Sequence, residues 1–306
     1  MLGPSYLRLH QSGELRERAD RLRELASPCA LCPHLCRANR ASGKTGICAA
    51  GLEAQVSSAF AHFGEERPLV GSSGSGTIFF CGCNLRCSFC QNWEISHNYD
   101  QGRTFGPHQL AALLLNLQRQ GCHNINFVTP THFAHVIVEA VEIAAGAGLT
   151  LPLVYNCGGY ERSETLKLLE GLIDVYMPDV KFFDDGIAAR FVEAKDYGSR
   201  AREALLEMHS QVGNLEVSPV GTAVRGLLIR HLVMPNGLAG TGSWASWIVE
   251  NLSADSYVNI MSQYRPCFQA DRDPEISRRP TPDELRQARQ QALAAGLSGR
   301  GFLTDF

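Results

Sequence analysis

Residues 83–90 read Cys83-Asn-Leu-Arg-Cys87-Ser-Phe-Cys90 and come just after a short apolar run, Thr77-Ile-Phe-Phe80. The C-x3-C-x2-C spacing places three thiols in one loop. Three thiolates can hold three corners of a cubane iron–sulfur cluster, whereas a closed site of the ordinary kind uses four. The remaining iron would stay open to a ligand, in the way that a catalytic zinc site keeps a free position. We therefore predict that Cys83, Cys87 and Cys90 are metal ligands.

A further cysteine, Cys81, precedes these three and leaves another interpretation open. With Cys81 included, four thiols could close a ferredoxin-like cluster or a zinc knuckle that has no free corner. The context favours the open cluster, because the triad lies between a predicted strand and a predicted helix at the start of a long α/β repeat.

Strand-like and helix-like segments alternate six times from Thr77 onward. The predicted strands are residues 77–80, 124–128, 151–156, 174–181, 227–234 and 257–264. The predicted helices are residues 107–120, 134–147, 163–170, about 200–212 and 242–252, and a last helix begins at the capping sequence Thr281-Pro-Asp-Glu284. Strands that alternate with helices in this way indicate right-handed βαβ units and a parallel sheet. Ligands bind beyond the carboxyl ends of such strands.

The N-terminal part of the chain has a different character. Residues 12–26 place Leu15, Ala19, Leu22 and Ala26 on one stripe, which predicts a surface helix. Residues 64–76 are rich in glycine and serine and are predicted to be a linker into the first strand. We predict two parts: residues 1–70, with a helix and a cysteine-rich segment, and residues 71–306, with the α/β repeat.

The cysteine-rich segment holds a second group of thiols, Cys29, Cys32, Cys36 and Cys48. Four thiolates are enough to close a tetrahedral zinc site or a complete iron–sulfur cluster. Four reduced thiols without metal are the simpler alternative. Metal binding would also help this loop-rich segment to fold.

Composition excludes several classes of protein. Of the 306 residues 44% are hydrophobic and 19% are charged, as in ordinary globular proteins. The formal charge of −3 gives no indication of nucleic-acid binding. No apolar stretch approaches the roughly 20 residues of a membrane span. Eleven cysteines, an odd number, favour metal binding in a reducing compartment over disulfides, and we expect a cytoplasmic protein.

Three stretches carry a resemblance to a known family: residues 29–36, Cys-Ala-Leu-Cys-Pro-His-Leu-Cys; residues 82–92, which contain the triad; and residues 261–266, Met-Ser-Gln-Tyr-Arg-Pro. They resemble the radical S-adenosylmethionine (SAM) superfamily and, within it, the uncharacterised iron–sulfur proteins of the pyruvate formate-lyase activating enzyme-like type. The resemblance implies an open (three-quarter) parallel β/α barrel of about six βα units. It covers about residue 77 to the C-terminus.

The resemblance also implies a chemistry. The three cysteines would hold a [4Fe–4S] cluster, and SAM would chelate its fourth iron. Reductive cleavage of SAM would give a 5′-deoxyadenosyl radical for hydrogen abstraction, with activation of a glycyl radical enzyme as one use. The implied partners are a protein, peptide or small-molecule hydrogen donor and a one-electron reductant such as flavodoxin or ferredoxin. Neither a membrane nor a nucleic acid is expected as a partner.

Four residues are implied to bind SAM. Phe89, directly before the last cysteine, would lie beside the adenine. Asp179 and Lys181 match an Asp-x-Lys segment that holds SAM in glycyl-radical-enzyme activating enzymes. Thr129 stands where many members have a Gly-Gly-Glu segment, so we assign it, or a neighbouring carbonyl, to the amino group of SAM. His132 is predicted to be a residue at the start of a helix.

Two other functions fit the cysteine content. The chain would be a non-catalytic electron carrier if both cysteine groups held closed iron–sulfur clusters. It would be a zinc-binding adaptor if they held zinc. Metal analysis separates the zinc protein from the iron proteins, and SAM turnover separates the enzyme from the carrier.

Overall fold

The structure is a computed structural model that describes residues 4–302 of the chain. The ends of the two predicted parts, residues 1–3 and 303–306, lie outside the described residues. The strands are β1 Ala54–His62, β2 Ser75–Phe80, β3 Arg103–Phe105, β4 Ile125–Val128, β5 Leu153–Cys157, β6 Val175–Val180, β7 Glu216–Val217, β8 Ala223–Leu232 and β9 Tyr257–Met261. The helices are α1 Tyr6–Ser12, α2 Glu14–Ala26, α3 Arg67–Val70, α4 Trp93–Ser96, α5 Pro107–Arg119, α6 Ala134–Gly146, α7 Ser163–Leu168, α8 Asp185–Phe191, α9 Tyr197–Val212, α10 Thr241–Asn251 and α11 Pro282–Ala294.

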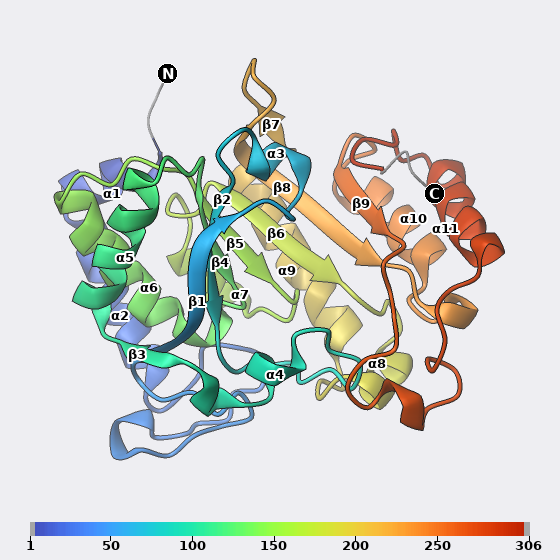
Figure 1. The fold of residues 1–306 in the computed structure, drawn as a ribbon, viewed down its shortest axis with the longest axis horizontal. Helices are drawn as coiled ribbons and strands as arrows, with labels where there is room; N and C mark the ends of the chain where they lie inside the picture. The colour runs from blue at the N-terminus through green and yellow to red at the C-terminus, as the bar shows by residue number, and fades with distance from the viewer. Residues whose placement is uncertain (1–3, 303–306) are drawn as a thin grey trace.

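The six predicted strands form a parallel sheet in chain order, β2-β4-β5-β6-β8-β9 (Figure 1). Strands β2 and β9 do not pair with each other, so the sheet is open. Strand β1 lies antiparallel along β2, strand β3 continues that edge, and the short β7 pairs with β8. This confirms the predicted α/β fold with an open parallel sheet of six βα units.

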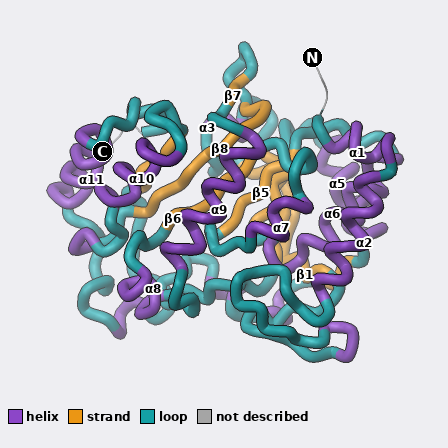
Figure 2. The backbone as a smooth tube through the Cα atoms, turned by 180° about the vertical axis from the view of Figure 1, so that it is seen from behind, coloured by secondary structure: helices purple, strands orange, loops and turns teal. Residues whose placement is uncertain are grey.

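The strands are apolar on both faces because both faces are covered. All five residues of β5 are buried. Helices α7 and α9 cross the outer face of the sheet, as seen from behind in Figure 2. The carboxyl ends of the strands point toward the lower side of Figure 1, where α4 and the blue cysteine-rich segment also lie.

The helix predicted over residues 12–26 is present as α2, and a further short helix, α1, precedes it. Gly13 has a φ of 82°, a left-handed conformation that ends α1 and precedes α2. The predicted stripe is confirmed, since Leu15, Ala19, Leu22 and Ala26 are buried in the core. Helix α2 packs against α6, so this N-terminal region is part of the layer that covers the sheet (Figure 1).

Two elements between the cysteine-rich segment and β2 were not predicted. Strand β1 alternates buried and half-buried residues only at its start, around Ala54 and Val56, and this weak pattern hid it. The predicted linker, residues 64–76, contains the short helix α3. The division of the chain at residue 70 stays a prediction; β1, on the N-terminal side of that point, is hydrogen-bonded along β2.

No helix among residues 4–302 combines the length and apolar character that crossing a membrane requires.

A buried carboxylate joins the N-terminal region to the sheet. Asp174 accepts hydrogen bonds from the backbone N–H groups of Leu153, at 2.9 Å, and Ser5, at 3.3 Å. Burial raises the pKa of Asp174 from 3.8 to about 6, although these hydrogen bonds and Arg225 oppose the rise. The folded chain therefore holds this proton more tightly than the unfolded chain does. The resulting stabilisation is present at low pH and is lost as the pH rises through the folded pKa.

We predict that Asp174→Asn removes this pH dependence. The free energy of unfolding of the wild type should fall by about 3 kcal/mol relative to the variant as the pH rises from about 4 to about 7. Urea titrations at several pH values measure the difference. Asp255→Asn, at an exposed position, is the control and should follow the wild type. An Asp174→Asn profile parallel to the wild type would contradict the assignment.

Candidate functional site

A cavity of about 420 Å³ opens at the carboxyl ends of the parallel strands. The loop after β2, the tips of the next four parallel strands and residues around β9 all contribute to its wall. Among its lining residues are the three triad cysteines together with Phe89, Thr129, Asp179 and Lys181. The predicted site residues come from distant parts of the sequence, and all of them line this one cavity.

The triad thiols are free and lie close together. Cys83 and Cys90 are half-buried, and Cys87 is buried. Burial raises the pKa of Cys83 to about 11; Cys90 adds to this rise, and Lys181 opposes it. Burial also raises the pKa of Cys87, with Lys181 opposing and the other two thiols adding. An incoming metal cluster would supply the positive charge that these thiolates need.

Cys81 does not share the cavity with the triad. It is fully buried, and a Cβ atom added at Gly102 would lie 2.9 Å from its sulfur. Gly102 precedes β3, so the Cys81 side chain points toward the β1–β3 edge. Within residues 4–302, no three His, Cys, Asp or Glu side chains are arranged to hold a single ion. Three thiols in one loop fit a cubane cluster, in which each cysteine binds a different iron atom.

The cluster loop is fixed by its own backbone and by neighbouring loops. The Leu85 N–H lies 3.4 Å from the Cys83 sulfur. Arg86 adopts a φ of 46°, a left-handed conformation that is rare for a non-glycine residue. Asn84 donates a side-chain hydrogen bond to the Tyr160 carbonyl at 2.9 Å, which ties the loop to the β5–α7 connection. His97 lies 3.2 Å from the Cys87 carbonyl oxygen. The loop is therefore held before any ligand arrives.

Opposite charges meet at the ends of β6 and β8. Asp179 Oδ2 lies 3.1 Å from Lys181 Nζ, and Asp179 Oδ1 lies 2.7 Å from Arg230 Nε. Arg230 is the register partner of Asp179 on the neighbouring parallel strand, so both side chains leave the same face of the sheet. Arg230 also donates to Asn156 Oδ1, at 2.8 Å, and pairs with Glu65 at 3.3 Å.

This network keeps its members charged. Burial acts to raise the pKa of Asp179, but Arg230 and Lys181 outweigh it and hold the pKa below its usual value. Burial acts to lower the pKa of Lys181, but Asp179 and then Cys87 raise it above its usual value. A fixed ammonium group therefore faces the triad, and a fixed carboxylate lies beside it.

Thr129 and Phe89 shape two other walls of the cavity. Thr129 follows β4 and has a φ of 60°, while its N–H donates to the Asn156 carbonyl at 2.9 Å. Such strain in a non-glycine residue commonly occurs at binding sites. Phe89 is buried and packs edge-on against Phe182 and Tyr264, with ring centroids 5.7 and 6.1 Å apart.

Three residues near the predicted strand ends, His132, His231 and Gly159, are not among the residues that line the cavity. His132 is buried at the start of α6, as predicted, with Nε2 2.8 Å from the Cys81 carbonyl. His231 is buried between the Val180 carbonyl and the Thr241 hydroxyl, at 2.9 and 2.8 Å. Gly159 has a φ of 79°, and an added Cβ would lie 2.8 Å from the Asp179 carbonyl, so this glycine serves close packing of the chain.

The cavity wall also holds residues that were not predicted to belong to the site, among them Arg230, Glu65 and Cys157. Arg230 lies in a largely apolar strand, and its partners Asp179 and Glu65 come from other parts of the chain. Cys157 lines the cavity at the end of β5. Its thiol is hydrogen-bonded to the buried Glu161 carboxyl group. Only the tertiary fold places Cys157 near the triad.

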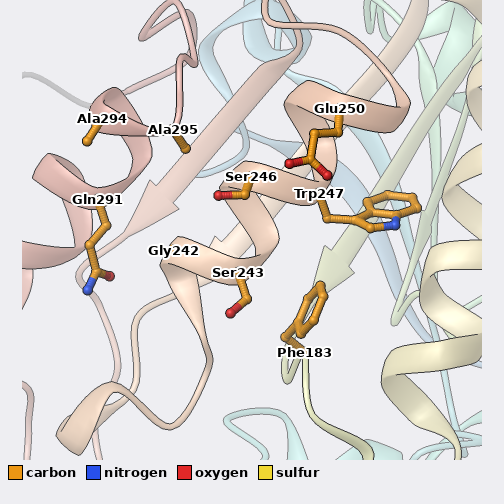
Figure 3. Close-up of a pocket in the computed structure, with 9 residues that line it drawn as sticks. All are labelled: Phe183, Gly242, Ser243, Ser246, Trp247, Glu250, Gln291, Ala294 and Ala295. Atoms are coloured by element: carbon orange, nitrogen blue, oxygen red, sulfur yellow. The ribbon is translucent and has the colours of Figure 1, made fainter.

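A second cavity, of about 740 Å³, lies between α10 and α11 (Figure 3). Phe183 and Trp247 form one side of it, and Ser243, Ser246 and Gln291 line the rest. Glu250 is the only charged residue among the side chains that line it. It lacks the convergent polar and charged groups that mark a reaction site, so the cavity at the strand ends is the better candidate.

Two solved structures are similar to this chain at low sequence identity. "Native anSMEcpe with bound AdoMet" is 11% identical with a TM-score of 0.46 and covers 70% of this chain. A histidine-tagged form of anSMEcpe, also with bound AdoMet, is 12% identical with a TM-score of 0.41 and covers 61%. The chain spans 57% and 50% of the length of these two proteins.

Two further comparisons are based on the sequence. The "Uncharacterized protein MJ0674" of Methanocaldococcus jannaschii is 34% identical over 271 residues, which are 86% of this chain and 74% of that protein. Residues 77–222 match the family model of the radical SAM superfamily, and this segment contains the cysteine triad, Thr129, Asp179 and Lys181. Residues 77–222 of the chain belong to the radical SAM superfamily.

Proposed function

We propose that this chain cleaves SAM reductively and uses the product to abstract hydrogen from a donor. The observation that carries the proposal is the single cavity shared by Cys83, Cys87, Cys90 and the Asp179–Lys181 pair. The match of residues 77–222 to the radical SAM superfamily supports it. When bound, a [4Fe–4S] cluster supplies one electron that splits SAM into methionine and a 5′-deoxyadenosyl radical.

The three cysteines would hold that cluster. Cys81 points away from the cavity, and the Cys157 thiol is engaged by Glu161, which supports a cluster with one open corner. The buried loop keeps water from much of the triad, since Cys87 and Phe89 are less than a tenth exposed. Solvent exposure is one of the factors that set a cluster potential.

The charged network would orient SAM. The Lys181 ammonium is placed to pair with the SAM carboxylate, because it is partly buried and faces the triad. Asp179 keeps one oxygen on Lys181 and the other on Arg230, so its position is set by two cations. Thr129 would receive the amino group, and Phe89 would flank the adenine. Holding SAM in one orientation contributes to catalysis because it lowers the entropic part of the barrier.

Within this class we assign the chain to the pyruvate formate-lyase activating enzyme-like type. The Asp179-Val-Lys181 segment at a strand end supports this assignment. The donor would then be a glycine residue of a glycyl radical enzyme, and the reductant a flavodoxin or ferredoxin.

The triad is tested by removing one thiol at a time. Cys83→Ala, Cys87→Ala and Cys90→Ala should each lower the iron of the anaerobically reconstituted protein by about four atoms per chain. Each variant should also abolish release of 5′-deoxyadenosine and methionine after dithionite reduction. Cys122→Ala, a buried cysteine outside the cavity lining, should behave as the wild type. Full SAM cleavage by a triad variant would refute the proposal.

Lys181 is tested by the affinity for SAM. Lys181→Ala should weaken SAM binding at least about tenfold, because a charge-assisted contact of about 1.5–3 kcal/mol is lost. Equilibrium dialysis against labelled SAM gives the affinity, and iron analysis shows that the cluster remains. Lys167→Ala, an exposed lysine on α7, is the matched control. An unchanged affinity in Lys181→Ala would remove the clamp assignment and leave the cysteine assignment standing.

The type of donor has its own experiment. Incubation of the reduced enzyme and SAM with a glycyl radical enzyme should generate a glycine-centred radical in the partner, visible by electron paramagnetic resonance. The same mixture with Cys87→Ala in place of the wild-type enzyme should give no radical signal. Steady formation of 5′-deoxyadenosine without any radical in the glycyl radical enzymes tested would assign the donor to another class.

A further inference from the structure

The cysteine-rich segment brings its four thiols together. Cys29, Cys32 and Cys48 are buried, and Cys36 is exposed. Cys36 and Cys48 both lie near enough to Cys29 to interact with it electrostatically. An added Cβ at Gly46 would lie 2.4 Å from the Cys36 sulfur, so only glycine leaves room for that side chain.

The backbone supplies hydrogen bonds to three of these sulfurs. Cys29 accepts from the backbone of Leu31, Cys32 from His34 and Cys48 from Ala50. Each donor lies two residues after its cysteine. Cys83 of the triad has the same arrangement, with Leu85 as the donor. Donors aimed at sulfur stabilise the thiolate form, which is the form that binds metal.

A buried arginine lies among the thiols. Arg40 is 4% exposed and donates from Nη2 to the sulfurs of Cys29, at 3.1 Å, and Cys48, at 3.6 Å. Its Nη1 donates to the His132 and Gly51 carbonyls. No carboxylate among residues 4–302 forms an ion pair with Arg40, and its Nε atom is buried without a hydrogen-bond partner.

A buried guanidinium without a carboxylate needs another negative group, because burying an uncompensated charge is costly. Arginine cannot lose its charge in a protein. Four metal-bound thiolates would supply the missing negative charge at the place where the guanidinium points. The loop also holds left-handed residues, with φ 45° at Leu35, 55° at Arg37 and 59° at Ala49. Such strained residues persist when the surrounding structure fixes them, as a metal centre would.

We propose that Cys29, Cys32, Cys36 and Cys48 hold a second iron–sulfur cluster, whose negative charge Arg40 compensates. One guanidinium nitrogen reaches the sulfurs of Cys29 and Cys48, so these two thiols face a common point. Four thiolates complete the ligand set of a closed cubane cluster, and zinc, which four thiolates can also hold, is one of the outcomes that the test distinguishes.

The second cluster fixes the loop of the first. His34 lies between Cys32 and Cys36, and its Nε2 is 2.7 Å from the Asn84 carbonyl in the triad loop. Arg40 reaches the His132 carbonyl, at 2.7 Å, and the His132 ring reaches the Cys81 carbonyl just before the triad. Loss of the second cluster would therefore loosen the triad loop as well as the N-terminal segment. This inference does not rest on SAM chemistry.

The test separates the two clusters by mutation. The triple variant Cys83→Ala, Cys87→Ala, Cys90→Ala should keep about four iron atoms and about four sulfides per chain after anaerobic reconstitution, where the wild type holds about eight of each. Adding Cys36→Ser to the triple variant should remove them. Cys36 is exposed, so this change leaves the core intact, and circular dichroism checks the fold. Cys267→Ser, at a half-buried cysteine, is the matched control.

Two results would overturn the proposal: a triple variant without iron, or one with zinc in place of iron and sulfide. The role of Arg40 has a separate readout. Arg40→Gln in the triple variant should release iron to a chelator at least about tenfold faster, and Arg40→Lys should lie between the two. If the folded Arg40→Gln chain released iron at the same rate as the triple variant with Arg40 intact, Arg40 would not compensate the charge of the cluster. If the triple variant holds its iron but the wild type does not cleave SAM, only the proposed function fails.

Discussion

The Asp179 carboxylate is shared between Lys181 on one side and Arg230 on the other, and the site depends on this arrangement. An isolated buried ammonium would lose its charge, because desolvation favours the neutral form. With Asp179 beside it, Lys181 stays charged and faces the thiols. Arg230 forms a second ion pair with Asp179, so this carboxylate stays charged and is held between two cations. The pair of neighbouring parallel strands fixes this geometry, since Asp179 and Arg230 are partners in register.

The loops above the strands are tied to one another as well as to the sheet. The Tyr197 hydroxyl lies 2.9 Å from the carbonyls of both Gly158 and Asp179 and accepts the Lys181 N–H at 3.0 Å. Asn84 joins the triad loop to the β5–α7 connection. A binding site built in this way is largely formed before its ligand arrives, which lowers the entropic cost of binding.

Much of this architecture could be predicted from local pattern. Apolar strands alternating with capped helices indicated the parallel sheet, and the Thr281–Glu284 capping box begins α11 as expected. The triad was visible from spacing alone. Arg230, Cys157 and Glu65 could not be assigned in this way, because their roles depend on partners that only the tertiary fold brings near. Strand β1 was missed because its burial pattern is irregular and its pairing with β2 stabilises it.

The proposed function requires a cluster with one open iron and a SAM molecule held between that iron and Lys181. An anaerobic crystal structure of the reconstituted protein with SAM tests both points at once. The account predicts three cysteine-bound iron atoms, the methionyl end of SAM on the fourth, and the SAM carboxylate within hydrogen-bonding distance of Lys181 Nζ. A cluster closed by Cys81 or Cys157 as a fourth ligand, or SAM bound outside this cavity, would contradict it.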